Sequence, residues 1–311
     1  MKIAMITAEE CGIPAATLAE IRKNGLEIVC RKCRTETDLL NTASDAQVLW
    51  MFGPNPVVTP EVLEKLPQCR AIFRSGSGLD ALPVLRATEL GIAVCNTPES
   101  IAESVAEHTV ALLLSLVRQV PQFDREVRGG EWNSGNNRTH WHLSGRTLGL
   151  VGYGRIARDV ERMVSGFRMR VIHFDPFSPA STPLDELLKE SDFVSLHCPL
   201  NESTHHLMGT EQFKLMKPGA LLVNTSRGPV IDEAALIAAL KSGRLGGAAL
   251  DVTTEEPPAP DNPLRQLDNV ILTPHVAAFS GDFEKNFWDC SVKKLIALKS
   301  GNFKEESVNL K

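Results

Sequence analysis

The sequence has no apolar run long enough to cross a membrane. Its longest apolar stretch, Val110 to Val117, is far shorter than the roughly 20 residues of a membrane-spanning helix. Residues Met1 to Thr7 have the pattern of a β-strand rather than that of a signal peptide. We therefore expect a soluble, cytoplasmic protein without a membrane partner.

An excess of positive charge is also absent. The chain has 33 Lys and Arg against 38 Asp and Glu, a formal net charge of -5, and its basic residues are spread along the sequence. This distribution lacks the basic footprint of a nucleic-acid-binding protein. A small anionic substrate would have to be attracted by a local group of positive charges.

The 7 cysteines have no regular spacing. An odd number of separate thiols in apolar contexts is typical of a protein from a reducing compartment. Cys30 and Cys33 are close in sequence, but no second Cys or His pair follows at zinc-site spacing. We therefore expect no bound metal.

The chain of 311 residues is too long for one ordinary core, and its length predicts two domains. Strand-like and helix-like segments alternate, which predicts an α/β protein with parallel, doubly wound sheets. In the first part we expect strands at 2–7, 47–52 and 71–74 and helices at 17–23 and 61–66.

A long apolar helix is expected at 101–119, where apolar side chains recur at helical spacing. Ser100 and Glu103 form a capping-box pattern at its start, and Pro121 ends the run. Such a helix is suited to burial between domains or subunits.

Strands and helices alternate regularly from 147 to 275. The expected strands are 147–151, 170–174, 193–197, 220–224, 247–252 and 270–273. The expected helices are 155–164, 183–189, 211–216 and 233–240, followed by a final amphipathic helix at 283–298. Thr210 and Asp232 are the expected N-caps of two of these helices.

A glycine-rich turn follows the first of these strands. Gly152, Gly154 and Ala157 form a G-x-G-x-x-A pattern, in which the first Gly permits a tight turn and the second lets the backbone approach a pyrophosphate. The phosphates would lie at the positive end of the following helix, beside Arg155. Asp175 ends the next strand at the spacing of about 20 residues expected for an acid that binds ribose hydroxyls. No adjacent Arg would receive a 2′-phosphate, so the pattern predicts NAD rather than NADP.

Three polar clusters follow later strands. They contain Arg227, Glu256 and His275. The carboxyl ends of parallel strands meet at one edge of a sheet, where open α/β folds bind their ligands. The sequence therefore predicts that an Arg, a Glu and a His converge at one rim.

Nearly the whole chain resembles the D-isomer-specific 2-hydroxyacid dehydrogenase family, which includes glyoxylate/hydroxypyruvate reductases and phosphoglycerate dehydrogenases. The resemblance is carried by the dinucleotide pattern and by a set of short motifs. These are 74–80 (RSGSGLD), 96–98 (NTP), 103–108 (ESVAEH), 197–200 (HCPL), 224–228 (NTSRG), 247–252 (GAALDV), 256–257 (EP) and 273–275 (TPH).

The resemblance implies roles for the three converging residues. Arg227 matches the arginine that grips the substrate carboxylate and keto oxygen, and its planar fork suits a carboxylate. His275 matches the general acid and base, and Glu256 matches the carboxylate that orients it. Imidazole is suited to proton transfer near neutral pH.

The resemblance also implies ligand-binding residues. The loop Ser75, Gly76, Ser77 and Gly78, together with Arg227, would bind the substrate carboxylate through a small nest of amides. Asp251 would meet the nicotinamide amide. The NAD site would be lined by Gly152, Gly154, Arg155, Ile156, Asp175, Cys198, Thr225, Arg227, Asp251, His275 and Ser77.

The domain layout implied by the family is discontinuous. Residues 1–98 and 276–311 would form a flavodoxin-like substrate-binding domain, and residues 99–275 a Rossmann NAD-binding domain inserted into it. The apolar helix 101–119 and the segment from Trp132 to Trp141 suggest a homodimer, in which Trp141 either reaches the partner's active site or packs at the interface.

The expected reaction interconverts a small 2-hydroxy acid and its 2-keto acid. The stretch Thr35 to Glu64 contains no Lys or Arg, although phosphate recognition normally relies on charge-assisted bonds from those residues. This favours an unphosphorylated acid such as glyoxylate or hydroxypyruvate, unless Arg138 of a partner supplies the charge. Two alternatives remain open: a D-3-phosphoglycerate dehydrogenase, and a non-enzymatic NAD-sensing protein like the related corepressors.

Two departures from the family pattern lie near the expected site. Ala81-Leu82-Pro83 follows Asp80, where the family often has Asn-Ile-Asp, and Val276 stands where a Gly commonly follows the catalytic His. These departures bear on substrate identity more than on reaction type.

Overall fold

The computed structural model describes residues 1–132 and 141–310. These residues separate into two compact units, Met1–Ile101 with Ser280–Lys311 and Ala102–Phe279. The predicted domain boundaries lie three or four residues before these division points. Assignment of substrate and cofactor binding to the two units stays a prediction.

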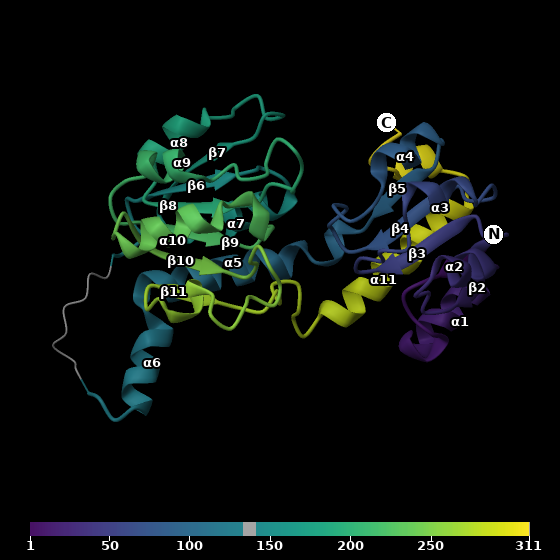
Figure 1. The fold of residues 1–311 in the computed structure, drawn as a ribbon, viewed down its shortest axis with the longest axis horizontal. Helices are drawn as coiled ribbons and strands as arrows, with labels where there is room; N and C mark the ends of the chain where they lie inside the picture. Colours follow the sequence, from purple (N-terminus) through teal and green to yellow (C-terminus); the bar gives the residue numbers. More distant parts are fainter. Residues whose placement is uncertain (133–140, 311) are drawn as a thin grey trace. The chain divides into compact units, whose positions relative to one another are not determined.

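Unit 1 contains a five-stranded sheet in the order β2-β1-β3-β4-β5, and every pairing is parallel (Figure 1). Its strands are β1 (Lys2–Met5), β2 (Glu27–Cys30), β3 (Val48–Phe52), β4 (Ala71–Ser75) and β5 (Ala93–Asn96). Its helices are α1 (Ala15–Lys23), α2 (Glu36–Ala43), α3 (Pro60–Glu64), α4 (Val84–Glu89), α11 (Phe283–Lys299) and α12 (Phe303–Glu306). This strand order is that of flavodoxin-like folds.

Successive strand residues face opposite sides of the sheet, so unit 1 has two cores. Trp50 and Phe73 pack with α1 and α11 on one face. Leu49 and Ile72 pack with α2, α3 and α4 on the other. The final helix α11, distant in sequence, is therefore part of the core of unit 1.

Unit 2 contains a six-stranded parallel sheet in the order β11-β10-β9-β8-β6-β7. Its strands are β6 (Thr147–Val151), β7 (Arg170–Phe174), β8 (Phe193–Leu196), β9 (Ala220–Asn224), β10 (Leu245–Leu250) and β11 (Val270–Leu272). Its helices are α5 (Ala102–Arg118), α6 (Val120–Arg128), α7 (Arg155–Val164), α8 (Leu184–Glu190), α9 (Thr210–Leu215) and α10 (Glu233–Lys241). Helices α5 and α7 cover one face, and α8, α9 and α10 cover the other.

The strand order of unit 2 reverses at β6, where β7 lies on one side and β8 on the other. Such a switch point opens a crevice at the carboxyl ends of the strands, where α/β folds bind nucleotides. Two parallel doubly wound sheets confirm the predicted fold class.

Of the three predicted helix caps, two differ from the structure and one is confirmed. Helix α5 begins at Ala102, and the Ser100 hydroxyl donates to the Thr97 carbonyl at 2.6 Å instead of capping that helix. The N-cap of α9 is Gly209, not Thr210. The Gly209 amide donates a hydrogen bond to the Gln212 side chain. Asp232 does cap α10, accepting from the Ala235 amide at 3.1 Å.

Pro121 does not terminate the helical run as expected. The break falls at Gln119, whose φ of 51° is left-handed, and a second helix, α6, starts at Val120 with Pro121 in its first turn. Proline is tolerated there because the first amides of a helix have no intrahelical acceptor. In Figure 1, α6 extends away from the sheet of unit 2.

Candidate functional site

Three neighbouring strands of unit 2, β9, β10 and β11, each lead into a loop with one of the three converging residues. Arg227 follows β9, Glu256 follows β10 and His275 follows β11. The three residues therefore belong to the same edge of the sheet, the edge formed by the carboxyl ends of its strands.

His275 and Glu256 are in direct contact. Nδ1 of His275 lies 2.7 Å from Oε2 of Glu256, and the two side chains are 49% and 38% exposed. The other carboxylate oxygen, Oε1, accepts from the Thr253 amide at 3.3 Å. This geometry turns one imidazole nitrogen toward a carboxylate while much of the ring stays accessible.

The backbone of His275 is left-handed, with a φ of 54°. Few residues other than glycine adopt this conformation, and it persists only where the surroundings enforce it. The His275 amide donates to the Asp251 carbonyl at 2.8 Å, and the Asp251 carboxylate accepts from the amides of Val276 at 3.0 Å and Ala277 at 2.9 Å. Asp251 thus binds the chain on both sides of the strained residue.

Asp251 is buried and only 2% exposed. Its Oδ1 also accepts from the Thr273 hydroxyl at 2.5 Å and lies 3.5 Å from Nε2 of His108. Burial alone raises the pKa of this carboxyl, but hydrogen bonds from His108, Thr273 and the two amides outweigh that effect and lower the pKa to about 2. Asp251 was predicted to meet the nicotinamide amide; here both of its oxygens are engaged by the protein.

Asn224, at the end of β9, braces the loop that carries Arg227. It is fully buried; Nδ2 donates to the Arg227 carbonyl at 2.9 Å, and Oδ1 accepts from the amide of Ser226 at 2.9 Å. Gly228 is required next to Arg227, because a Cβ there would collide with the backbone of Thr253. The loops after β9 and β10 are consequently in close contact.

The glycine turn after β6 has the shape that a dinucleotide needs. Gly152 has a φ of 88°, and a Cβ on it would lie 2.6 Å from the Cys198 amide nitrogen. A Cβ on Gly154 would meet nothing within 4 Å, which leaves space for a phosphate beside the first residues of α7, Arg155 and Ile156. Ala157 is fully buried against the sheet. These residues fit a pyrophosphate at the helix N-terminus.

Asp175 connects the end of β7 to this turn. One carboxylate oxygen accepts from the Tyr153 amide at 2.8 Å, and the other accepts from the Phe177 amide at 2.9 Å. A carboxylate has about four lone-pair sites, so each oxygen can accept a further bond from a ribose hydroxyl. The Tyr153 ring stacks on His173 with centroids 3.6 Å apart, which gives the turn a rigid flank.

Thr225 and Cys198, the other predicted cofactor contacts in this unit, are both buried. The Thr225 hydroxyl lies 2.9 Å from that of Thr109 on α5. Burial raises the pKa of the Cys198 thiol to about 11, so this thiol is not a nucleophile. Burial lowers the pKa of the neighbouring His197 to about 4, and its Nε2 lies 2.9 Å from the Ser195 hydroxyl.

The predicted carboxylate loop follows β4 in unit 1. The Ser75 hydroxyl is buried and lies between Trp50 Nε1 at 2.8 Å and the Ser291 hydroxyl at 2.7 Å. Gly76 has a φ of 96°, and its amide donates to the Thr97 hydroxyl at 2.9 Å. The Ser77 carbonyl accepts from Asn96 at 2.8 Å. The loop is therefore held from several sides, and the side chain of Ser75 serves the core of unit 1.

Three residues of the site lie within the sequence motifs, but their roles were not predicted. His108 and Thr273 both lie within quoted motifs, but only the fold brings them to Asp251, with His108 Nε2 lying 3.1 Å from the Thr273 hydroxyl. Asn224 was likewise quoted without a role.

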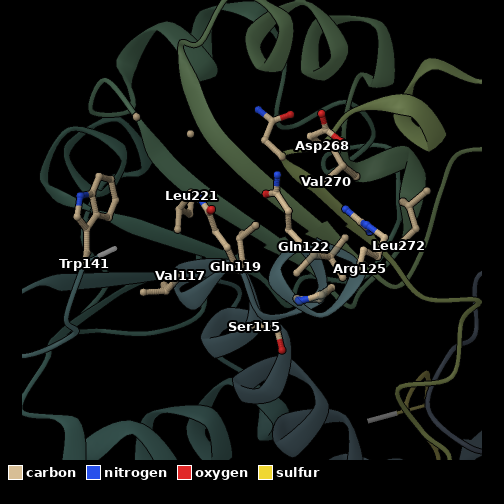
Figure 2. Close-up of a pocket in the computed structure, with 16 residues that line it drawn as sticks. Ser115, Val117, Gln119, Gln122, Arg125, Trp141, Leu221, Asp268, Val270 and Leu272 are labelled. Atoms are coloured by element: carbon tan, nitrogen blue, oxygen red, sulfur yellow. The ribbon is translucent and has the colours of Figure 1, made fainter. Parts of the chain in front are cut away.

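A cavity lies within unit 2 at the other edge of the sheet, near the starts of β9, β10 and β11 (Figure 2). It has a volume of about 580 Å³ and is walled by residues such as Val117, Leu221 and Val270, with Gln122 and Arg125 from α6. Trp141 belongs to this wall and packs on Arg146 and Phe193 of its own unit. This position favours a packing role for Trp141. Arg138 lies outside the described residues.

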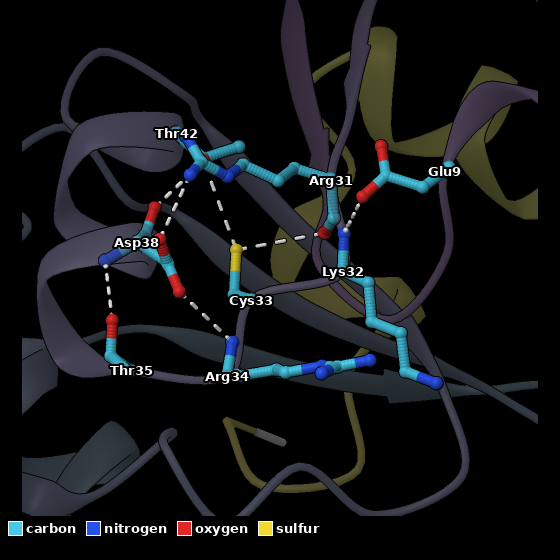
Figure 3. A network of polar contacts seen from close by, with 8 residues as sticks. All are labelled: Glu9, Arg31, Lys32, Cys33, Arg34, Thr35, Asp38 and Thr42. Atoms are coloured by element: carbon cyan, nitrogen blue, oxygen red, sulfur yellow. Dashed lines mark hydrogen bonds and ion pairs between the residues drawn. The ribbon is translucent and has the colours of Figure 1, made fainter.

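Cys33, the second cysteine of the C-x-x-C pair in unit 1, is part of a polar network (Figure 3). The Cys33 thiol lies 3.6 Å from the Arg31 carbonyl and 3.7 Å from the Thr42 hydroxyl, and Arg31 pairs with Asp38 at 2.9 Å. Over residues 1–132 and 141–310, no group of three or more His, Cys, Asp or Glu side chains is arranged to hold a metal ion. Within the same residues, no helix combines the length and apolar character needed to span a bilayer.

Known proteins match the chain over both units. Residues 110–277 match the family model described as the NAD-binding domain of D-isomer specific 2-hydroxyacid dehydrogenases. A glyoxylate reductase from Korarchaeum cryptofilum is 40% identical over 87% of this chain and 85% of its own length. A D-3-phosphoglycerate dehydrogenase from Methanocaldococcus jannaschii is 40% identical over 89% of this chain, but the match spans only 54% of that relative.

A solved structure of similar architecture is a D-lactate dehydrogenase from Aquifex aeolicus in complex with NAD and lactic acid. It is 29% identical, has a TM-score of 0.84, and the match covers 99% of each chain. Sequence and fold similarity therefore extend over both units rather than over the nucleotide-binding unit alone.

Proposed function

Because the chain belongs to the D-isomer-specific 2-hydroxyacid dehydrogenase family, an NAD-dependent oxidoreductase family, we propose that it interconverts a small 2-keto acid and its D-2-hydroxy acid. His275 would be the general acid and base, Glu256 its orienting partner and Arg227 the ligand of the carboxylate and keto groups. The observation that supports this proposal most directly is the 2.7 Å contact between His275 Nδ1 and Glu256 Oε2.

His275 transfers the proton in this proposal. Glu256 faces Nδ1, so Nε2 is the nitrogen available to the substrate oxygen. In its protonated form, the imidazole can donate a proton as a keto group is reduced. In the reverse direction, the neutral imidazole accepts the hydroxyl proton. The contact of Nδ1 with Glu256 orients the ring for both directions.

Arg227 supplies the positive charge that an anionic substrate requires. Its guanidinium can bind the carboxylate with two parallel hydrogen bonds and also polarise the keto oxygen. By the family resemblance, backbone amides of the loop at Ser75–Gly78 would also bind the substrate carboxylate. The hydroxyl of Ser75 and the amide of Gly76 are engaged by Trp50 and Thr97, so we assign the anion contacts to the backbone of Ser77 and Gly78.

NAD, when bound, supplies or accepts the hydride. The turn at Gly152 and Gly154 would hold its pyrophosphate, with Arg155 and Ile156 at the helix start, and Asp175 would accept hydrogen bonds from the adenosine ribose. Thr225, Cys198 and Ser77 would line the cofactor. Asp251 would meet the nicotinamide amide, in addition to binding the loop of His275.

The preferred substrate is an unphosphorylated acid of the size of glyoxylate or hydroxypyruvate. No Lys or Arg is present in residues 35–64, so charge-assisted bonds worth about 1.5–3 kcal/mol each would be lacking for a phosphate. Because a D-3-phosphoglycerate dehydrogenase is also similar to this chain, the phosphorylated acid is the main alternative substrate.

The decisive experiment is NADH oxidation with glyoxylate, hydroxypyruvate, phosphohydroxypyruvate, pyruvate and bulkier keto acids. We expect kcat/KM to be higher for hydroxypyruvate than for its phosphorylated form. A roughly tenfold preference for the phosphorylated acid, equivalent to about 1.4 kcal/mol, would reverse the substrate assignment. Lack of turnover with every acid would support a non-enzymatic NAD-binding role instead.

We also propose that the protein forms a homodimer through α5, α6 and the cavity between α6 and β11. Helix α6 has no buried residue, and it exposes Val120 by 55% and Val127 by 50%, followed by Trp132 at 80%. A nine-residue helix of this kind is marginal without packing. A second copy of the chain would supply that packing and cover the apolar cavity of Figure 2.

A further inference from the structure

We propose that His108, on α5, is a positioning residue for the proton donor His275 and acts through Thr273 and Asp251. This inference rests on the proposed role of His275. His108 is remote in sequence from the loops after β9, β10 and β11, yet its Nε2 lies 3.1 Å from the Thr273 hydroxyl and 3.5 Å from Asp251 Oδ1.

The number of protons available determines which atom donates and which accepts in each of these hydrogen bonds. A threonine hydroxyl has one proton, and the 2.5 Å contact gives that proton to the Asp251 carboxylate, which can only accept. Thr273 must therefore accept the bond from His108. His108 thus carries a hydrogen on Nε2, and the chain of donors runs from His108 to Thr273 to Asp251.

The end of this chain is the backbone of His275. The Asp251 carboxylate accepts from the amides of Val276 and Ala277, while its carbonyl accepts from the amide of His275. These three bonds enclose a residue whose φ of 54° is unfavourable for a side chain with a Cβ. If the carboxylate rotates, the turn loses the two bonds from the amides of Val276 and Ala277.

His108 has the position needed to prevent that rotation. Its side chain is 24% exposed, whereas that of Asp251 is 1% exposed. The neighbouring Thr109 bonds to Thr225 at 2.9 Å, so α5 is also attached to the loop after β9. Consecutive residues of one helix therefore brace the loops that carry Arg227 and His275.

The test uses the full-length enzyme with three variants. His108→Phe keeps a planar ring and removes the donor, His108→Gln retains an amide donor, and Glu107→Gln changes an exposed neighbour on the same helix as the control. Each is assayed for kcat and KM with hydroxypyruvate and NADH, and NADH affinity is measured separately by fluorescence.

We expect His108→Phe to lower kcat about tenfold or more, because small displacements of a catalytic group are costly. KM and NADH affinity should change less than about twofold, His108→Gln should recover most of kcat, and Glu107→Gln should resemble the wild type. Wild-type kcat in His108→Phe, or equal losses in the Phe and Gln variants, would overturn the proposal.

A second variant keeps the test decisive if His108→Phe folds poorly. Thr273→Val removes the intermediate hydroxyl, and its effect on kcat should not add to that of His108→Ala, which also removes the donor, because both act through one chain of bonds. Fully additive losses would contradict the proposal. Full activity of His275→Ala would instead remove the proposed function itself, whereas an inactive His275→Ala beside an unaffected His108→Phe would remove only the role of His108.

Discussion

Nδ1 of His275 lies 2.7 Å from Oε2 of Glu256, although 19 positions separate the two residues in sequence. The pair comes together because β10 and β11 are adjacent parallel strands whose following loops meet at one edge. A carboxylate next to one imidazole nitrogen determines which nitrogen is left for a substrate.

We predict that His275→Ala lowers kcat by about two to four orders of magnitude, the usual contribution of general acid–base catalysis. Glu256→Gln should cause a smaller loss, since an amide can accept the Nδ1 hydrogen but cannot stabilise a positive ring. Steady-state assays with NADH and hydroxypyruvate measure both effects. NADH affinity should stay near the wild-type value, and near-normal turnover of His275→Ala would exclude it from the mechanism.

The cofactor preference is predicted to depend on Asp175. A carboxylate at the ribose repels a 2′-phosphate, so the wild type should prefer NADH to NADPH, and Asp175→Ala should narrow that difference. The matched control is Asp185→Ala, an exposed carboxylate on α8. The ratio of kcat/KM for the two cofactors is the measurement, and equal efficiencies in the unmutated enzyme would contradict the prediction.

The proposed dimer can be tested on α6. Light scattering at micromolar concentration should give twice the mass of the chain for the wild type, and Val127→Asp should shift the protein toward the monomer by placing a charge in an apolar interface. Leu85→Asp is the control, because Leu85 is 83% exposed and belongs to unit 1. A monomeric wild type would refute the dimer.

Acid stability is predicted to depend on His197. Burial lowers its pKa from 6.5 to about 4 in the folded chain, so the unfolded chain binds a proton first as the pH falls. The stabilisation present above pH 6.5 is consequently lost between about pH 6.5 and pH 4, by about 3 kcal/mol. Asp251, with a pKa lowered to about 2, stays charged through this window.

Urea unfolding at pH 7, 5.5 and 4 measures this effect. His197→Gln cannot gain the proton, so its free energy of unfolding should fall less steeply than that of the wild type over this range. The exposed His205→Gln should follow the wild type. Equal slopes for the wild type and His197→Gln would show that another group controls the acid response.

Some elements were hard to recognise because their stability comes from packing. The sequence analysis did not predict two strands, β2 and β5, or two helices, α2 and α4. Each of these strands has only four residues. Such short segments have weak periodicity of their own. Helix α2 begins where the Thr35 hydroxyl accepts a hydrogen bond from the Asp38 amide, but burial of Leu39 against the sheet is what makes the helix part of the core.

The sequence by itself determined the features that depend on neighbours along the chain. Gly152 and Gly154 specified a turn after β6, Asp232 specified the start of α10, and the alternating apolar segments specified two parallel sheets. Tertiary structure decided which side chains act together. His108, Asp251 and Thr273 belong to α5 and to the loops after β10 and β11, and their bonds exist only once those elements pack. Hydrogen bonding requires separations near 3 Å, which local sequence patterns cannot specify for residues more than a hundred positions apart.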